Sequence, residues 1–167
     1  MKRLFEFPDP VNEYSARLVA LGVVGMCVAI LAFGQTWLIA VLAYGFIARV
    51  LTGPTLSPLG TFVTRVVTPL LPVEPRLTAG PPKRFAQGIG ATLSVAAAIA
   101  HFGFGATTLA MGLIAAIVVA ASLEAFLGFC LGCTIFAALM RVGLVPESVC
   151  ADCADLSRRQ VRAGTAA

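Results

Sequence analysis

The sequence predicts an all-α integral membrane protein with four transmembrane helices arranged as two hairpins, followed by a short cysteine-bearing segment. The 167-residue chain has a mean hydropathy of +0.93, with 59% hydrophobic and 12% charged residues. A soluble domain has roughly 25% charged residues. No charged residue occurs in 18–48, 85–123 or 125–140, and apolar runs of about 18 residues are candidate membrane spans. These two observations favour lipid over water as the solvent.

The first hairpin is expected from two apolar stretches separated by a short turn. Residues 17–33 form the first predicted span and residues 37–51 the second, with Gly34, Gln35 and Thr36 between them. Short connections join antiparallel neighbours. Trp37 stands at the start of the second span, where amphipathic aromatics anchor helices at the interface.

A proline-rich connection, residues 52–85, separates the two predicted hairpins. Its prolines are Pro54, Pro58, Pro69, Pro72, Pro75, Pro81 and Pro82. This density excludes one continuous helix across the connection. Within it, Phe62–Val67 is either a short amphipathic turn at the membrane surface or an ordinary ordered loop.

The second hairpin repeats the pattern of the first. Residues 86–102 and 107–129 are the third and fourth predicted spans, joined by a glycine-containing turn at 103–106. The chain is thus predicted to be one membrane domain, residues 1–153, with a flexible tail at 154–167.

Basic residues predict the orientation of the chain in the bilayer. They are absent from the two turns and gather at the amino end, in the connection and in the carboxyl region. Positive charge stays on the cytoplasmic side, so both termini are expected in the cytoplasm of a multi-pass inner-membrane protein. The net charge of +4 is explained by topology and the lipid bilayer, without nucleic acid as a partner.

Two cysteine pairs form the candidate functional site. Cys130 and Cys133 close the fourth predicted span, and Cys150 and Cys153 follow a linker. This spacing is typical of a zinc site, in which four thiolates surround one ion. It also suits redox dithiols that exchange electrons or sulfur with a soluble partner. The cytoplasm keeps thiols reduced, so no permanent disulfide is expected.

The electrostatics of Cys130 argue against a thiolate unless a partner is present. Its surroundings are apolar, which disfavours the charged form, so a metal or Arg141 would have to compensate. His101, the single histidine, lies at the opposite end of the predicted bundle and cannot complete a site with the cysteines.

Glu124 is the one carboxylate inside a predicted span. A membrane carboxylate marks a functional site or an ion pair, and its candidate partners are Arg17, Arg49 and Arg84, each at the cytoplasmic end of another span. On one continuous helix Glu124 and Cys133 point in nearly opposite directions. Glu124 is therefore not assigned to the thiol site.

Several strings in the chain resemble a bacterial membrane family known as domain of unknown function 4395. The most specific are Pro81-Pro82-Lys83-Arg84-Phe85-Ala86 and Gly128-Phe129-Cys130-Leu131-Gly132-Cys133, within a resemblance that covers about residues 7 to 155. The resemblance implies a small multi-span inner-membrane protein associated with thioredoxin-like and rhodanese-like proteins. It supplies no catalytic residue.

Two functions remain open at this point. One is an accessory role in thiol-disulfide or sulfur-transfer chemistry with a soluble thioredoxin-like or rhodanese-like partner, using Cys130, Cys133, Cys150 and Cys153. The other is a non-catalytic membrane scaffold in which the same four cysteines hold a structural zinc. The sequence does not decide whether the protein is an enzyme.

Overall fold

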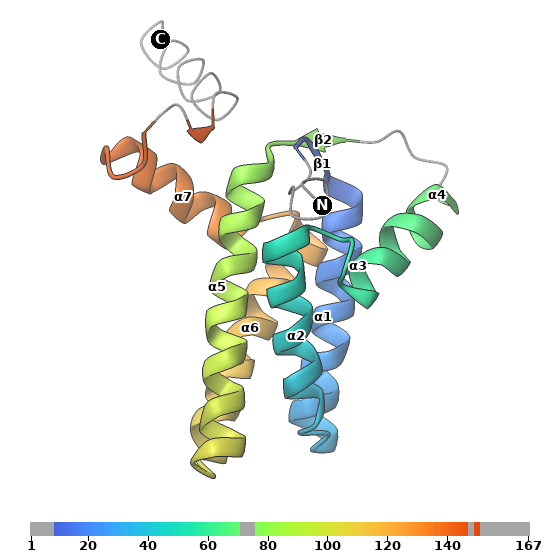
Figure 1. Cartoon of the computed structure of the whole chain (residues 1–167), viewed down its shortest axis with the longest axis vertical. Helices are drawn as coiled ribbons and strands as arrows, with labels where there is room; N and C mark the ends of the chain where they lie inside the picture. Colours follow the sequence, from blue (N-terminus) through green and yellow to red (C-terminus); the bar gives the residue numbers. More distant parts are fainter. Residues whose placement is uncertain (1–8, 71–75, 147–148, 151–167) are drawn as a thin grey trace, which may run out of the picture.

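Four long helices lie side by side in the computed structural model, which describes residues 9–70, 76–146 and 149–150. They are α1 (Glu13–Phe33), α2 (Leu38–Thr52), α5 (Gly80–Ala98, continued by the π-helix η3, Ile99–Gly103) and α6 (Thr107–Leu127) (Figure 1). Successive helices run in opposite directions. The all-helical class predicted from the sequence is confirmed.

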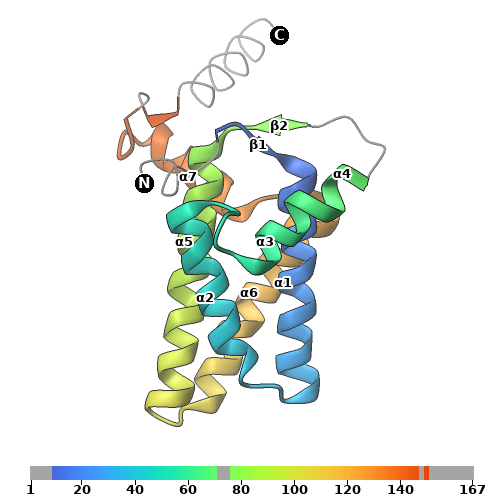
Figure 2. The same ribbon diagram turned by 45° about the vertical axis from the view of Figure 1, so that its right-hand side comes forward.

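The two ends of the bundle differ in composition. One end, here called the charged end, is where α1 and α5 begin and α2 and α6 finish. It also carries the short strands β1 (Val11–Asn12) and β2 (Leu77–Thr78) and the helix α7 (Leu131–Arg141) (Figures 1 and 2). The other end, the turn end, contains the connections from α1 to α2 and from η3 to α6.

Local caps explain where the first hairpin begins and turns. The Asn12 side chain accepts a hydrogen bond from the backbone N–H of Tyr14 at 3.0 Å and caps α1, as an N-cap residue does. Gly34 ends the helix in the left-handed conformation, with φ of 66°, which glycine adopts without strain. The first two helices thus match the predicted spans closely, with α1 starting four residues earlier.

The helix α5 begins six residues before the predicted span, at Gly80 instead of residue 86. Pro81 and Pro82 occupy its first turn, where a missing N–H removes no helical hydrogen bond. Pro81 and Pro82 therefore start a helix, although the sequence predicts them in the connection, residues 52–85. The fourth predicted span ends two residues early, at Leu127.

The connection itself is also more helical than predicted. Residues Pro58–Leu70 form α3 (Pro58–Phe62), the π-helix η2 (Val63–Val67) and α4 (Thr68–Leu70), which follow one another without a break and lie beside α1 (Figure 2). The Ser57 hydroxyl caps α3 by accepting from the N–H of Gly60 at 3.2 Å. The Phe62–Val67 segment is thus helical and not a loop.

Helices from different hairpins make the tightest contacts. The pairs α1 with α6 and α2 with α5 pack together more extensively than α1 with α2. Gly90 permits one of these approaches, because a Cβ there would lie 2.3 Å from the Phe46 ring. The core between the four helices is apolar and includes the fully buried Ile39, Leu42 and Ile114.

A two-stranded ribbon joins the starts of α1 and α5. Val11 pairs with Thr78 and Asn12 with Leu77 in antiparallel register. The N–H of Glu13 donates to the carbonyl of Arg76 at 2.8 Å, and their side chains form an ion pair at 3.1 Å. The ribbon fixes the two helix starts to each other at the charged end.

The outside of the bundle is apolar. Large exposed side chains on its helices include Leu21, Val28, Val41, Ile47, Leu109 and Val119, a surface that water would not favour. Within the described parts of the chain, three helical segments are long and apolar enough to cross a membrane, namely Glu13–Phe33, Gly80–Gly103 and Thr107–Leu127. The remaining bundle helix, α2, is an apolar helix of 15 residues and spans about 22 Å at 1.5 Å per residue.

Candidate dithiol site

The helix α6 ends between Glu124 and the first cysteine pair. Gly128 ends α6 in the left-handed conformation with φ of 67°, and a new helix, α7, begins at Leu131 with Cys130 as its N-cap. The sequence predicts that Cys130 and Cys133 lie at the end of one continuous fourth span. The glycine turn corrects this prediction and moves both thiols onto a separate helix.

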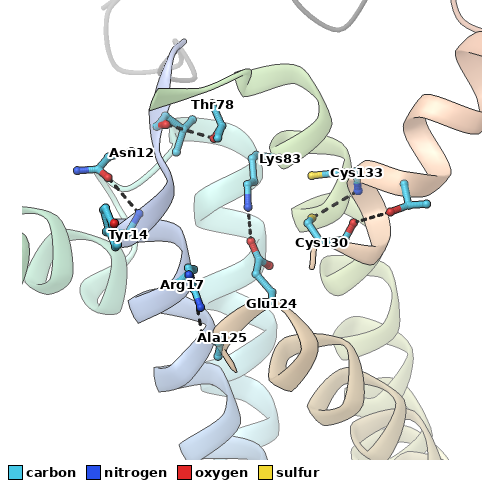
Figure 3. Close-up of polar contacts among 11 residues, drawn as sticks. Asn12, Tyr14, Arg17, Thr78, Lys83, Glu124, Ala125, Cys130 and Cys133 are labelled. Atoms are coloured by element: carbon cyan, nitrogen blue, oxygen red, sulfur yellow. Dashed lines mark hydrogen bonds and ion pairs between the residues drawn. The ribbon is translucent and has the colours of Figure 1, made fainter. Parts of the chain in front are cut away.

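Cys130 and Cys133 lie together in the first turn of α7 (Figure 3). The backbone N–H of Cys133 donates to the Cys130 sulfur at 3.4 Å. Both cysteines are free thiols; Cys130 is 9% exposed, and Cys133 is more exposed. A helix N-terminus stabilises negative charge, so this is the position where a thiolate is most stable.

The two thiols are electrostatically unequal. The pKa of the Cys130 thiol is lowered because the Cys133 thiol donates a hydrogen bond to its sulfur and because the Lys83 ammonium attracts the negative charge, against the opposing effects of burial and Glu124. The same hydrogen bond raises the pKa of Cys133, and burial adds to it. The arrangement therefore favours a Cys130 thiolate beside a protonated Cys133.

Lys83 also forms the ion pair with Glu124. Its Nζ donates to Glu124 Oε1 at 2.5 Å across the start of α5 and the end of α6 (Figure 3). The side chains are only 10% and 14% exposed. Because the chain turns at Gly128, the Lys83–Glu124 pair lies close enough to act electrostatically on both thiols. Glu124 thus belongs to the surroundings of the dithiol, contrary to the argument from a continuous helix.

The three arginines proposed as partners of Glu124 have other contacts. Arg17 donates to the carbonyls of Ala125 at 3.3 Å and Phe126 at 3.0 Å (Figure 3). These carbonyls belong to the last turn of α6, where a cation is favourable. Arg84 donates to the carbonyl of Val50 at 3.0 Å. The partner of Glu124 is a lysine that the sequence argument did not consider.

Arg49 lies on α2 and is 5% exposed. Its Nε donates to Gln87 Oε1 at 2.8 Å and its Nη1 to the Ser57 hydroxyl at 3.2 Å. The guanidinium also sits 4.5 Å from the centre of the Phe46 ring.

Close packing fixes α7 against α5. A Cβ at Gly132, between the two cysteines, would lie 2.6 Å from the Cα of Ala86. One turn further on, the rings of Phe85 and Phe136 pack in a tilted arrangement, with 5.6 Å between their centres and 56° between their planes. The glycine of the Cys-Leu-Gly-Cys string therefore has a steric role, since it lets the thiol-bearing turn approach the helix that carries Lys83.

The second cysteine pair is described only in part. Cys150 is disulfide-bonded, contrary to the expectation of free thiols, and Cys153 lies outside the described residues, as does the tail 154–167. Within residues 9–70, 76–146 and 149–150, no group of three or more His, Cys, Asp or Glu residues is placed to hold a metal.

Two other candidate residues, His101 and Arg141, lie away from the thiols. His101 lies in η3 and makes a 3.2 Å hydrogen bond with Thr107, at the turn end as expected. Arg141 ends α7, ten residues after its start, whereas the cation near Cys130 is Lys83.

Fold and site together define a class, namely a helical bundle with a lipid-compatible surface and a cysteine pair on a short helix beyond its charged end. The chain belongs to the family described as Domain of unknown function (DUF4395), whose match covers residues 11–141. The matched region includes Cys130 and Cys133 and stops before Cys150. The suspected family is thus confirmed. Comparisons with curated proteins and with solved structures found no match.

Proposed function

We propose that this protein is a bacterial inner-membrane thiol-exchange accessory whose working group is the Cys130–Cys133 pair. The observation that carries the proposal is the position of Cys130 as N-cap of α7, with a donor from Cys133 and with Lys83 nearby. Reactive cysteines occur at helix starts beside cations. The soluble partner is a thioredoxin-like or rhodanese-like protein.

The membrane part of the proposal has four spans. The fourth is α2, which is shorter than the other three but packs along α5 in the same bundle. A short span is accommodated by local thinning of the bilayer. The charged end faces the cytoplasm, because the basic residues gather there, and both termini and the dithiol lie on that side.

Exposure suggests how a disulfide between the two cysteines would exchange with a partner. A thiolate of a thioredoxin-like dithiol attacks the sulfur of Cys133, the more accessible of the two. The Cys130–Cys133 bond breaks, and Cys130 leaves as the thiolate of lowered pKa, which makes it the better leaving group. The second partner thiol then displaces Cys133. Two electrons pass from partner to membrane protein, and the partner becomes a disulfide; the steps also run in reverse.

The same pair can accept sulfur from a rhodanese-like persulfide. The Cys130 thiolate attacks the terminal sulfur, the donor cysteine leaves as a thiolate, and a persulfide forms on Cys130. Cys133 then attacks the inner sulfur, so that a Cys130–Cys133 disulfide forms and hydrosulfide is released. Both routes use the same unequal pair of thiols.

A redox titration tests the proposal. The purified full chain in neutral detergent is equilibrated with glutathione buffers, alkylated and analysed by peptide mass spectrometry. We expect Cys130 and Cys133 to oxidise together and reversibly to an intramolecular disulfide, while Cys27, a fully buried core residue, stays reduced. A Cys130→Ser variant should trap a mixed disulfide between Cys133 and a thioredoxin-like protein. A pair that never forms the internal disulfide at any potential contradicts the proposal.

The zinc scaffold is the alternative outcome of the same preparation. It requires about one zinc per chain by elemental analysis and thiols that are protected from alkylation until a chelator is added. It also requires Cys150 and Cys153 in the reduced form. Metal-free protein whose thiol count follows the potential supports exchange over the scaffold.

A further inference from the structure

A cavity of about 330 Å³ opens at the charged end, between α1, α2, the α3–η2–α4 segment and the start of α5. Its walls combine apolar residues such as Val11, Val19 and Pro54 with Arg49, Lys83 and Gln87. This volume lies in the range of small-molecule pockets, about 300–1,000 Å³. The cavity is separate from the thiols, which do not line it.

Arg49 is the unusual group in this cavity. The residue is 95% buried, and within the described parts of the chain its Nη2 is a buried atom with no hydrogen-bond partner. The other two guanidinium nitrogens donate to the neutral groups of Gln87 and Ser57. A buried charge is normally paired with an opposite charge.

The surroundings compensate only part of this charge. Arg49 lies over the Phe46 ring and in the last turn of α2, both favourable for a cation. Its electrostatic interaction with Glu124 is also favourable, but that carboxylate forms its ion pair with Lys83. Among the described residues, no carboxylate lies within ion-pair distance of Arg49.

We propose that this cavity binds an oxyanion, a phosphate or carboxylate carried on an apolar body, with the Arg49 guanidinium as its counter-charge. Guanidinium groups bind such anions through paired donors, and Nη2 is the donor still available. The apolar walls suit the rest of the ligand. The chemistry has two sources, namely the headgroup of an anionic lipid at the membrane surface or a soluble organic anion from the cytoplasm.

The test measures binding to the full chain in neutral detergent through its thermal unfolding, followed by circular dichroism. The probes are phosphatidylglycerol, phosphatidylcholine with the same acyl chains, and inorganic phosphate against chloride at equal ionic strength. We expect phosphatidylglycerol or phosphate to raise the unfolding temperature in a saturable manner. An effect of the lipid alone indicates a headgroup source, and an effect of phosphate indicates a soluble anion.

Two variants and one control decide whether the cavity is responsible. Arg49→Gln should raise the ligand concentration needed for a half-maximal rise in unfolding temperature at least about tenfold, since charge-assisted hydrogen bonds are lost. Arg65→Gln removes the same charge from an exposed position on η2, outside the cavity, and should leave it unchanged. Ala16→Leu fills the cavity without altering charge and should abolish the response, which covers the case in which Arg49→Gln fails to fold.

The proposal is overturned if phosphatidylcholine acts as strongly as phosphatidylglycerol while phosphate has no effect. It is equally overturned if Arg49→Gln and Arg65→Gln weaken the response alike, or if Ala16→Leu responds like the wild type. None of these measurements depends on the thiols, so the result is independent of the proposed exchange function.

Discussion

Replacing Lys83 by methionine tests the most consequential contact in the structure. The substitution keeps the length and apolar stem of the side chain but removes the ammonium that donates to Glu124. The Glu124 side chain is 14% exposed and would remain buried without its partner. Breaking a buried pair in this way costs about 3–5 kcal/mol.

That cost corresponds to a large shift in the unfolding temperature. At about 2–4 °C per kcal/mol for a chain of this size, Lys83→Met should unfold roughly 6–20 °C below the wild type. The double variant Lys83→Met/Glu124→Gln removes both charges and should recover most of the loss, because a neutral pair leaves no buried charge. Circular dichroism of the detergent-solubilised chain measures both shifts.

Arg17 provides the matched comparison, because the sequence argument named it as a candidate partner of Glu124. Arg17→Met removes two hydrogen bonds to carbonyls at the end of α6, and Glu124→Gln should not rescue it. The reasoning is refuted if Lys83→Met is as stable as the wild type. It is also refuted if Glu124→Gln rescues Arg17→Met and leaves Lys83→Met unchanged.

Four further outcomes follow from the contacts around α5 and α7. Gly132→Ala should destabilise the protein by about 1–3 kcal/mol, because its Cβ would overlap the backbone of Ala86; chemical denaturation measures this. Gly88→Ala, with open space around its Cβ, should instead be neutral or stabilise α5 by up to about 1 kcal/mol. Alkylation of Cys130 should decline as pH falls through a midpoint below the ordinary thiol value of 9.0, since the thiolate reacts. In Lys83→Met this midpoint should move upward, as read from iodoacetamide rates against pH.

The helical bundle could be predicted because it depends on long uniform signals. Uncharged runs set the four bundle helices, and Gly34 marks the first turn. The prediction was less accurate where the effect of a residue type depends on its position in a helix. Proline breaks the middle of a helix but is well accommodated in its first turn, so Pro81 and Pro82 were placed in the connection although they begin α5.

The candidate site was harder to predict because it depends on one turn. Nothing in the run from Leu123 to Met140 requires a break, yet Gly128 adopts a left-handed conformation and redirects the chain. This turn decides that Glu124, Lys83 and the thiols are neighbours. The available signal was Gly128 followed two residues later by Cys130, since glycine commonly ends a helix and a side chain that accepts a hydrogen bond can cap the next one.

The distribution of residues between the two ends of the bundle has a consequence for biosynthesis. Of the residues that the structure describes outside the helices, only the connections at 34–37 and 104–106 lie at the turn end, and neither carries a formal charge. In the proposed orientation each hairpin enters the bilayer with its tip leading, so that the connections carried across are these two short, uncharged turns. The ribbon, the α3–η2–α4 segment and α7 can then assemble afterwards, on the side where the chain is synthesised.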